Sequence, residues 1–345
     1  MGLKSKNTII GLAVIIIVII ALLAFFIIGW DSIFKSKDEE LSGGIDVTTN
    51  PFLWRIEGEN PSYLFGSIHL SDTRLLTLPD VVIEAIDEVD VVYTEVKFDE
   101  ETVLKTDQLS RLPSGQTIND LLPQDVEERV DSYLKNKGLD LSVYSPYKIW
   151  VVTSNLALLD ELEFLLTNPS LDQYIWNLAV SKDKNTGGIE TVEMQIDIFD
   201  SFSTEEQIEM LNDALDELED YASQGKTSIG VMKDAYLEGD LESLHSLAFS
   251  YDETDNDLYG KFIDLIFTDR NYNMTQFITD LITNNPGTQY FFTIGAGHYY
   301  GEDGLLNLLE NEGFTITRVQ FDESDSCDPG EERINNRCYE PYVTD

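Results

Sequence analysis

Hydrophobic and polar positions divide the chain into an apolar N-terminal run, a polar segment and a long region of strand and helix patterns. The stretch Ile9–Ile28 consists almost wholly of Ile, Leu, Val, Ala and Phe, and no charged residue occurs between Asn7 and Trp30. About 20 apolar residues in a helix span the hydrocarbon core of a bilayer. A cleaved signal peptide is the alternative, but its apolar region is shorter and ends in small residues. We therefore expect an uncleaved transmembrane helix over residues 9–30.

Charges on either side of this helix suggest its orientation. Lys4 and Lys6 precede it, while Lys35 and Lys37 follow it among several acidic residues. The lysine counts tie, so the positive-inside rule gives only a slight preference for an N-terminus inside the cell. The cysteine pair and the acidic remainder of the chain favour the same orientation. We expect a single-pass protein of the cell membrane with residues 1–8 in the cytoplasm and the folded part outside it.

A polar segment separates the predicted span from the folded region. Residues 31–49 are rich in Ser, Lys and Asp and show no periodic apolar pattern, which is typical of a linker. We expect one domain over residues 50–321, long enough to bury a core of ordinary size, and an acidic tail over residues 322–345.

Strand patterns lie at both ends of this domain, and helical patterns fill its middle. Short apolar and β-prone segments predict five strands, at Phe52–Ile56, Tyr63–Ser67, Val89–Val96, Gln289–Ile294 and Phe314–Val319. This order predicts an α+β domain whose N-terminal and C-terminal strands meet in one sheet.

One helix has a clear start in the sequence. Ser203 and Glu206 match a capping box, and apolar residues then recur on one face of the predicted helix. The opposite face, which we expect to be solvated, carries Glu209, Asp213, Glu217 and Asp220.

The chain is strongly acidic, with 64 Asp and Glu residues against 22 Lys and Arg residues and a formal net charge of −42. Such a surface repels phosphate, which excludes nucleic acid as a partner. Because the acids are spread along the chain, we interpret them as a solvated coat; a cationic partner or substrate is the alternative. The apolar fraction of 42% excludes a chain that is disordered throughout.

Two cysteines, Cys327 and Cys338, occur in the tail segment CDPGEERINNRC. They can form a disulfide or half of a metal site. A four-sulfur zinc site needs two more thiols, and no histidine lies near. We therefore predict a disulfide between them, which implies an oxidising compartment.

Two of the three histidines share a pattern. His69 ends the motif GSIH over residues 66–69, and His298 ends GAGH over residues 295–298. Each motif follows a predicted strand, and glycine there lets the backbone turn tightly and a ligand approach closely. If both strands lie in one sheet, the two imidazoles meet at one opening, where sites commonly form. The alternative is a structural histidine at a strand end, and we interpret the third, His245, as ordinary packing or surface.

Three more charged residues lie where they can complete a site. Glu95 interrupts a buried run, and an ionised acid there needs a partner unless it reaches solvent at the strand's end. Glu190 follows a glycine pair and an isoleucine, and its alternative is an exposed loop acid. Arg270 can clamp a carboxylate or stabilise an oxyanion, and a surface ion pair is its alternative.

Two histidines and one glutamate form a ligand set typical of catalytic divalent-metal sites. We predict that His69, His298 and Glu95 hold a metal ion that lowers the pKa of a bound water and polarises a carbonyl. Glu190 then serves as general base, and Arg270 assists catalysis. We expect residues that bind substrate to adjoin these motifs, namely Gly66, Ser67, Gly295, Gly297 and Asn271.

The order of these motifs resembles the TraB/GumN family, which includes the Tiki proteins and is related in fold to erythromycin esterase-like (EreA) and ChaN-like proteins. The resemblance covers most of the predicted domain. It rests mainly on YLFGSIHL (63–70), DVVYTE (90–95), LD (171–172), GIETVEMQ (188–195), DRN (269–271) and IGAGHYYG (294–301).

The resemblance implies a mixed sheet surrounded by helices, with His69, His298 and Glu95 at the active centre. It also implies metal-dependent proteolysis, with manganese or cobalt as the metal and zinc as a further candidate. Tyr299 stands where the family more often has leucine, and both the N-terminal anchor and the tail fall outside the family pattern.

These observations predict a membrane-anchored, extracytoplasmic metallohydrolase that cleaves a peptide or protein substrate. A different class of function is a non-catalytic protein that binds or sequesters peptides, because members of this family are linked to shutting down peptide pheromone signalling. Hydrolysis of a small ester is a third hypothesis, since the related esterases suggest it.

Overall fold

The structure, a computed structural model of the chain, describes residues 50–248, 257–319, 332–334 and 337–339. The predicted span over residues 9–30 and the linker over residues 31–49 lie outside these ranges, and so does Cys327. Among the described residues, no helix is both long enough and apolar enough to cross a bilayer. The membrane anchor, its orientation, the domain boundaries and the disulfide to Cys338 therefore stay predictions.

A mixed sheet organises the described domain. Its six strands lie in the order β4-β3-β5-β2-β1-β6, which brings together strands from both ends of the domain. Strands β2, β5, β3 and β4 run parallel to one another, whereas β1 pairs antiparallel with both β2 and β6. The strand bounds are Leu53–Ile56 (β1), Ser62–Ser67 (β2), Val91–Thr94 (β3), Asn185–Gly188 (β4), Tyr290–Gly295 (β5) and Ile316–Arg318 (β6).

The α+β prediction is confirmed, and so are its five strands, each within a few residues of the predicted bounds. Strand β4 was not predicted, and it comes from the middle of the chain instead of from either end. Its sequence, NTGG, has neither an apolar alternation nor a β-branched run. It becomes a strand because it pairs with β3 in register, Val91 opposite Asn185 and Thr94 opposite Gly188.

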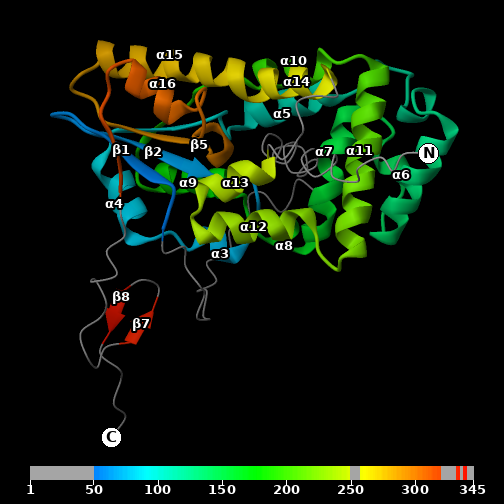
Figure 1. Cartoon of the computed structure of the whole chain (residues 1–345), viewed down its shortest axis with the longest axis horizontal. Coiled ribbons are helices and arrows are strands. Elements are labelled where there is room, and N and C mark those ends of the chain that lie inside the picture. Colours follow the sequence, from blue (N-terminus) through cyan, green and yellow to red (C-terminus); the bar gives the residue numbers. More distant parts are fainter. Residues whose placement is uncertain (1–49, 249–256, 320–331, 335–336, 340–345) are drawn as a thin grey trace, which may run out of the picture.

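Helices surround the sheet. In Figure 1, α15 runs above it, α3, α4 and α12 lie below it, and α6, α7 and α11 lie beyond one end. The helix bounds are Thr73–Leu76 (α3), Asp80–Glu88 (α4), Glu100–Ser110 (α5), Gln124–Asn136 (α6), Ile149–Leu156 (α7), Leu162–Thr167 (α8), Leu171–Ser181 (α9), Val192–Asp200 (α10), Thr204–Ser223 (α11), Ser228–Glu238 (α12), Leu241–Ala248 (α13), Asp257–Ile263 (α14), Asp269–Asn284 (α15) and Leu305–Asn311 (α16).

The two central strands are buried along their whole length. Every residue of β2 and of β5 is buried, which is the pattern of parallel strands covered on both faces. Ring contacts tie helices to the sheet: Phe277 of α15 packs on Tyr93 of β3, and Tyr236 of α12 packs on Phe52 beside β1. This packing fixes where each strand ends.

Helix α11 confirms its predicted start and corrects one expectation. Ser203 and Glu206 form the capping box, each side chain accepting a hydrogen bond from the other residue's backbone N–H. The prediction of a wholly solvated acidic face is wrong at Glu217, which is 1% exposed. Helix α7 packs against α11, and the sequence of one helix alone cannot show where its neighbour lies.

A separate hairpin lies in the tail. Strands β7 (Glu332–Ile334) and β8 (Arg337–Tyr339) pair antiparallel, and Cys338 lies opposite Arg333 in this register.

Candidate active site

Four neighbouring parallel strands each deliver one candidate residue to the same edge of the sheet. Ser67 at the end of β2 lies opposite Gly295 at the end of β5, so the segments that carry His69 and His298 leave the sheet together. Glu95 directly follows β3, and Glu190 lies two residues after β4. Since the carboxyl ends of parallel strands share one edge, the predicted convergence of these side chains is a consequence of the topology.

Close packing explains one glycine of the first motif. A Cβ atom at Gly66 would lie 2.8 Å from the Cβ of Phe52 and 3.3 Å from the Cβ of Ala296. A larger residue at this position would push β2 away from its neighbours, so glycine here serves the strand packing that sets the position of His69.

Arg270 lies at the centre of the charged network. A π-helical turn, Asp264–Thr268, joins α14 to α15 and places this arginine in the first turn of α15. Its Nη2 atom donates to Glu95 Oε2 and to Glu190 Oε2, each at 2.6 Å, and its Nε donates to Glu190 Oε1 at 3.0 Å. Arg270 is 3% exposed, so the alternative of a surface ion pair is wrong.

His298 is held as a neutral imidazole. Its Nδ1 lies 2.6 Å from Asn271 Oδ1, and its Nε2 lies 3.2 Å from Nη1 of Arg270. An amide oxygen only accepts and a guanidinium only donates, so the proton belongs on Nδ1 and the lone pair on Nε2. Complete burial and the adjacent positive charge of Arg270 lower the pKa of His298 to about 3.

His69 faces the opposite electrostatic environment. Its Nδ1 lies 2.7 Å from Asp172 Oδ2, and its Nε2 lies 3.6 Å from Glu95 Oε1. Burial lowers its pKa, but the carboxylates of Asp172 and Glu95 outweigh burial and raise the pKa to about 10. Within the described part of the chain, the buried Nε2 atom has no hydrogen-bond partner.

Glu95 connects the two histidines to the arginine. Its Oε1 accepts the backbone N–H of Gly295 at 2.7 Å, and its Oε2 accepts from Arg270 and, at 3.2 Å, from the amide of Gln195. Burial raises the pKa of Glu95, but Arg270 and His69 outweigh it and hold this pKa well below the ordinary glutamate value. Glu95 is therefore an ionised, buried carboxylate, and the alternative in which it reaches solvent is wrong.

Among the described side chains, the charges of this centre do not balance. Glu95, Glu190 and Asp172 supply three carboxylates against the single guanidinium of Arg270, which leaves two negative charges if both histidines are neutral. A buried, uncompensated charge is costly, so the centre takes up positive charge, either as a proton on His69 or as a cation. A divalent cation matches the excess of two charges.

The donor atoms fit such a cation in chemistry. The buried Nε2 of His69 is unpartnered among the described residues, His298 carries a lone pair on Nε2, and Glu95 supplies carboxylate oxygens. In the residues that the structure describes, however, no group of three or more His, Cys, Asp and Glu side chains lies close enough together to hold a metal ion. The guanidinium of Arg270 instead contacts atoms of Glu95, Glu190 and His298 that a bound cation would also contact.

Two residues of this centre were missed by sequence reasoning as functional candidates. Asp172, in the first turn of α9, contacts His69, and Gln195 of α10 donates to both Glu95 and Glu190. Both residues lie in segments that carry the family resemblance, although neither was given a role, and Ser170 marks a helix start whose first turn carries Asp172.

The residues predicted to bind substrate have contacts inside the protein. Ser67 donates to Asp172, and Asn271 accepts from His298 and donates to the carbonyl of Asp303. Gly295 donates its N–H to Glu95, and a Cβ at Gly297 would lie 3.0 Å from the ring of Phe267. That any of them binds substrate stays a prediction. His245 is half-buried and packs on Tyr300.

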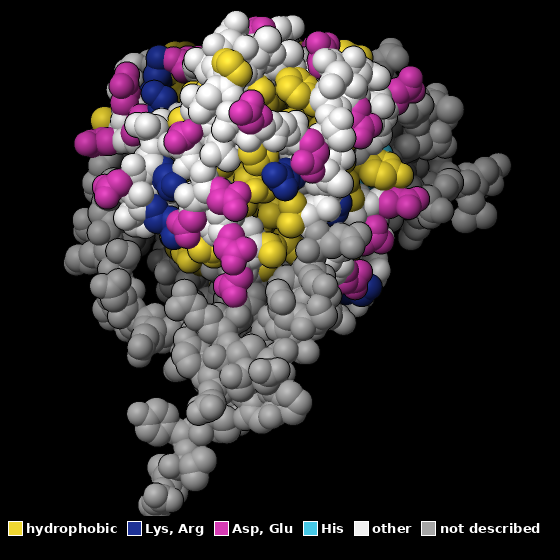
Figure 2. Space-filling model, turned by 90° about the vertical axis from the view of Figure 1, so that its left-hand side faces the viewer, with side chains coloured by type: hydrophobic (Ala, Val, Ile, Leu, Met, Phe, Trp, Pro, Cys, Tyr) yellow, Lys and Arg dark blue, Asp and Glu magenta, His cyan; other side chains and the backbone are white. Residues whose placement is uncertain are grey.

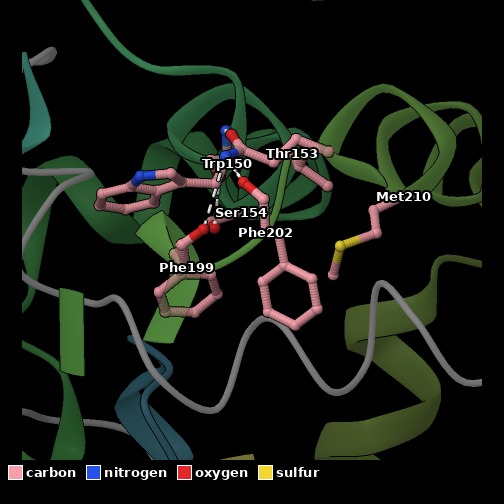
Figure 3. A pocket seen from close by; sticks show the side chains of 7 residues that line it. Trp150, Thr153, Ser154, Phe199, Phe202 and Met210 are labelled. Carbon is pink, nitrogen blue, oxygen red and sulfur yellow. Dashed lines mark hydrogen bonds between the residues drawn. The ribbon is translucent and has the colours of Figure 1, made fainter. Parts of the chain in front are cut away.

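The side chains of the centre are buried, and two cavities in the described residues lie away from it. Figure 3 shows one between α7, α10 and α11, about 10 Å³ in volume and lined by Trp150, Phe199 and neighbouring side chains. Its hydroxyl groups are turned back to their own helix, since Ser154 donates to the carbonyl of Trp150, and this volume holds at most one water. A second, open hollow of about 420 Å³ follows α12, from Lys226 to Glu238.

Acidic side chains are scattered over the face in Figure 2 and do not gather in one patch, as the spread of acids along the chain predicts. Hydrophobic side chains show between them near the middle of this face. A cationic partner as the reason for the charge gains no support from this face.

Comparisons with known proteins agree with the motif order. The model of the TraB/PrgY/gumN family matches residues 52–318. Curated relatives include a zebrafish (Danio rerio) protein named metalloprotease TIKI1, 26% identical over 310 residues, with 77% of this chain and 63% of the relative covered. Another is the metalloprotease TIKI homolog of Nematostella vectensis, 23% identical over 335 residues, with 84% of this chain and 71% of that protein covered. Human metalloprotease TIKI1 is 25% identical over 312 residues, with 77% of this chain and 61% of that protein covered. No solved structure matches.

Proposed function

The chain belongs to the TraB/PrgY/gumN family, and we propose that its buried centre is that of a metal-dependent peptidase. The observation that carries this proposal is the buried Nε2 of His69, which faces Glu95 in a centre that holds three carboxylates and one guanidinium. The names of the curated relatives, all metalloproteases, support the same reaction class. The chain spans 63% of the length of the zebrafish relative, so the activity of that whole protein comes to this chain as a proposal.

His69, His298 and Glu95 would hold the metal ion. When bound, the ion supplies a Lewis acid that polarises the scissile carbonyl and lowers the pKa of a water. Manganese or cobalt is our first expectation, and zinc also suits two imidazoles and a carboxylate. Since ligand histidines must be unprotonated, binding a cation at this centre requires His69 to release its proton from Nε2.

The remaining side chains prepare the centre for hydrolysis. Asn271 keeps the proton of His298 on Nδ1, so its Nε2 lone pair faces inward. Glu190 is the proposed general base, whose Oε1 accepts the proton of the attacking water after Arg270 Nε withdraws. Arg270 pairs with both glutamates in the resting state and can stabilise negative charge that develops on the substrate oxygen. The enclosed position of the centre excludes bulk water, which strengthens each of these interactions.

The second hypothesis, peptide binding without turnover, has one observation in its favour. Both oxygens of Glu190 are taken by Arg270, and Gln195 donates to Glu190 Oε2 as well. A base saturated in this way takes a proton only after its partners move. A protein that merely captures peptides needs no such movement.

Turnover separates the two hypotheses. The full chain is incubated with Mn²⁺ or Co²⁺ and a library of unstructured peptides, and products are counted by mass spectrometry. The peptidase predicts products beyond one equivalent of protein and their loss in His69→Ala. His245→Ala is the matched control, because this histidine lies outside the centre and packs on Tyr300. Binding of peptides with no product, or equal activity in wild type and His69→Ala, contradicts the peptidase.

We further propose that residues 9–30 anchor the domain in the cell membrane and leave it outside the cytoplasm. The apolar length of this segment and the pair Cys327 and Cys338 support the proposal. Protease accessibility in intact cells tests it: a tag after residue 345 should be cleaved from outside, and a tag before residue 1 should be protected. The reverse pattern contradicts it.

A further inference from the structure

The start of helix α9 is tied to the first histidine motif by three hydrogen bonds. Ser67 Oγ donates to Asp172 Oδ1 at 2.5 Å, and His69 Nδ1 lies 2.7 Å from Asp172 Oδ2. The backbone N–H of Leu171 donates to the carbonyl of Leu70 at 3.1 Å. Asp172 is 1% exposed, and each of its two carboxylate oxygens has a partner inside the protein. The carboxylate therefore bridges the last residue of β2 and the histidine two residues later.

This bridge dictates which nitrogen of His69 faces the centre. A carboxylate only accepts, so the proton of the imidazole lies on Nδ1 and points to Asp172. The ring is then fixed with Nε2 directed at Glu95, 3.6 Å away. Ser67 occupies the other oxygen of Asp172, which prevents the carboxylate from rotating away from the ring.

We propose that Asp172 is the positioning residue that orients His69, holding the imidazole proton on Nδ1 and presenting Nε2 to the metal-binding centre, with Ser67 orienting Asp172. The orientation rests on contacts of the metal-free chain, while its use in metal binding rests on the proposed function. His69 and His298 thus have different supports. His298 is oriented by the neutral amide of Asn271 and His69 by a carboxylate, which also makes Nε2 a stronger electron donor.

Asp172 lies in the first turn of α9. The N-terminal end of a helix carries a partial positive charge from unpaired N–H groups, which stabilises a nearby carboxylate. Helix α9 has 11 residues and Ser170 as its capping residue, whose side chain accepts from the N–H of Gln173. The helix thus supplies part of the compensation that a buried Asp172 needs.

Nuclear magnetic resonance of the histidine side chains tests the orientation without any metal. The full chain contains three histidines, so its ¹⁵N-histidine spectrum is simple to assign with His245→Gln and His298→Gln. The Nδ1–H of His69, bonded to a buried carboxylate, should give a low-field proton signal whether or not Nε2 is protonated. Asp172→Ala should abolish this signal. Asp172→Asn should retain it at higher field, because an amide oxygen still accepts, as Asn271 does for His298.

Metal affinity provides the second measurement. Titration with Mn²⁺ and Co²⁺ alone, followed by calorimetry, should show about 10- to 100-fold weaker binding in Asp172→Ala and a smaller loss in Asp172→Asn. Asp160→Asn is the matched control, since that carboxylate pairs with Lys137 instead of a histidine, and it should bind as the wild type does.

The outcomes separate the two proposals. An unchanged His69 signal in Asp172→Ala overturns the positioning role, and so does equal metal affinity in wild type and Asp172→Ala. An equal loss of affinity in Asp160→Asn also overturns it, because the effect would then be general. If the wild type binds neither metal, the proposed function fails, and the metal-free signal of His69 still decides whether Asp172 orients the ring. If Asp172→Ala does not fold, the chemical shift of the His69 Nδ1–H signal in Asp172→Asn decides: a shift to higher field supports the positioning role, and an unchanged shift overturns it.

Discussion

Replacing Arg270 by methionine removes the positive charge on which two buried carboxylates depend. Glu95 and Glu190 are 3% and 6% exposed, and Arg270 donates to both. Methionine keeps the unbranched stem near the backbone and its apolar packing, but it is shorter than arginine and donates no hydrogen bond. Arg270→Met therefore removes the guanidinium charge while leaving an unbranched side chain in the core.

The expected effect is large. Removing one partner of a buried ion pair costs about 3–5 kcal/mol, because the other charge stays buried without compensation. The total free energy of unfolding of a domain is about 5–15 kcal/mol, so Arg270→Met should take a large part of it. Arg111→Met is the matched control: this arginine pairs with Asp107 and its side chain is 44% exposed, so its loss should cost at most about 1 kcal/mol.

Urea unfolding at several pH values measures these differences. The pKa of Glu95 is depressed in the folded wild type, so its contribution is present above about pH 4.5 and is lost as pH falls through the folded pKa. In Arg270→Met, Glu95 loses the guanidinium that lowers its pKa and accepts a proton more readily, so the difference in free energy of unfolding between variant and wild type should narrow from pH 7 to pH 5. Adding Glu190→Gln to Arg270→Met should recover part of the loss, because one uncompensated charge disappears.

A loss of stability in Arg270→Met no larger than that in Arg111→Met would refute this electrostatic role, and so would a double variant less stable than Arg270→Met alone. Either result would mean that the carboxylates are neutral or hydrated in the folded protein. A loss that stays constant with pH would point to packing in place of charge.

Three further predictions concern pH dependence, strand packing and metal binding. The metal-free protein should be most stable near pH 6.5, because the contribution of His69 to the free energy of unfolding is full below that pH and is lost as the pH rises toward its pKa of about 10. The pKa of His298 is lowered to about 3, so stability also falls from pH 6.5 toward pH 3, and each effect changes the free energy of unfolding by about 1.4 kcal/mol per pH unit. In urea unfolding, His69→Gln should flatten the alkaline side of the stability profile and His298→Gln the acidic side. Gly187→Ala should lower the free energy of unfolding by about 1–3 kcal/mol, because the added Cβ would lie 2.4 Å from the ring of Tyr93. Gly260→Ala is the control and should be neutral or stabilising, because its Cβ would meet nothing within 4 Å. Equal melting temperatures for the two variants would contradict this prediction. Mn²⁺ at 100 times its Kd should add about 2.7 kcal/mol to the free energy of unfolding, and no shift would count against a metal site.

Much of the fold and the centre could be predicted from the sequence because the strands have strong local patterns. Apolar runs such as QYFFTI reflect central parallel strands that are buried on both faces, and β5 is one of them. The G-x-x-H motifs follow such strands directly, so strand ends in one sheet bring His69 and His298 together. Glu95 was predictable for the same reason, since it interrupts a buried strand at its end.

What could not be predicted depends on contacts between distant elements. Strand β4 has no periodicity of its own and exists through pairing with β3. Asp172 and Gln195 lie on helices and reach the centre only because α9 and α10 start at the same edge of the sheet. Glu217 lies on a polar face by helical periodicity, yet it is buried in the packed domain. A single sequence contains no direct signal for such packing.

The parallel pairing of β2 with β5 also determines when the centre can exist during synthesis. A ribosome releases the segment that carries His69 more than two hundred residues before the one that carries His298, and a pairing this remote in sequence forms slowly. A nascent or truncated chain that lacks β5 has one imidazole without its counterpart. If this centre cleaves peptides, the order of translation itself keeps an unfinished molecule inactive.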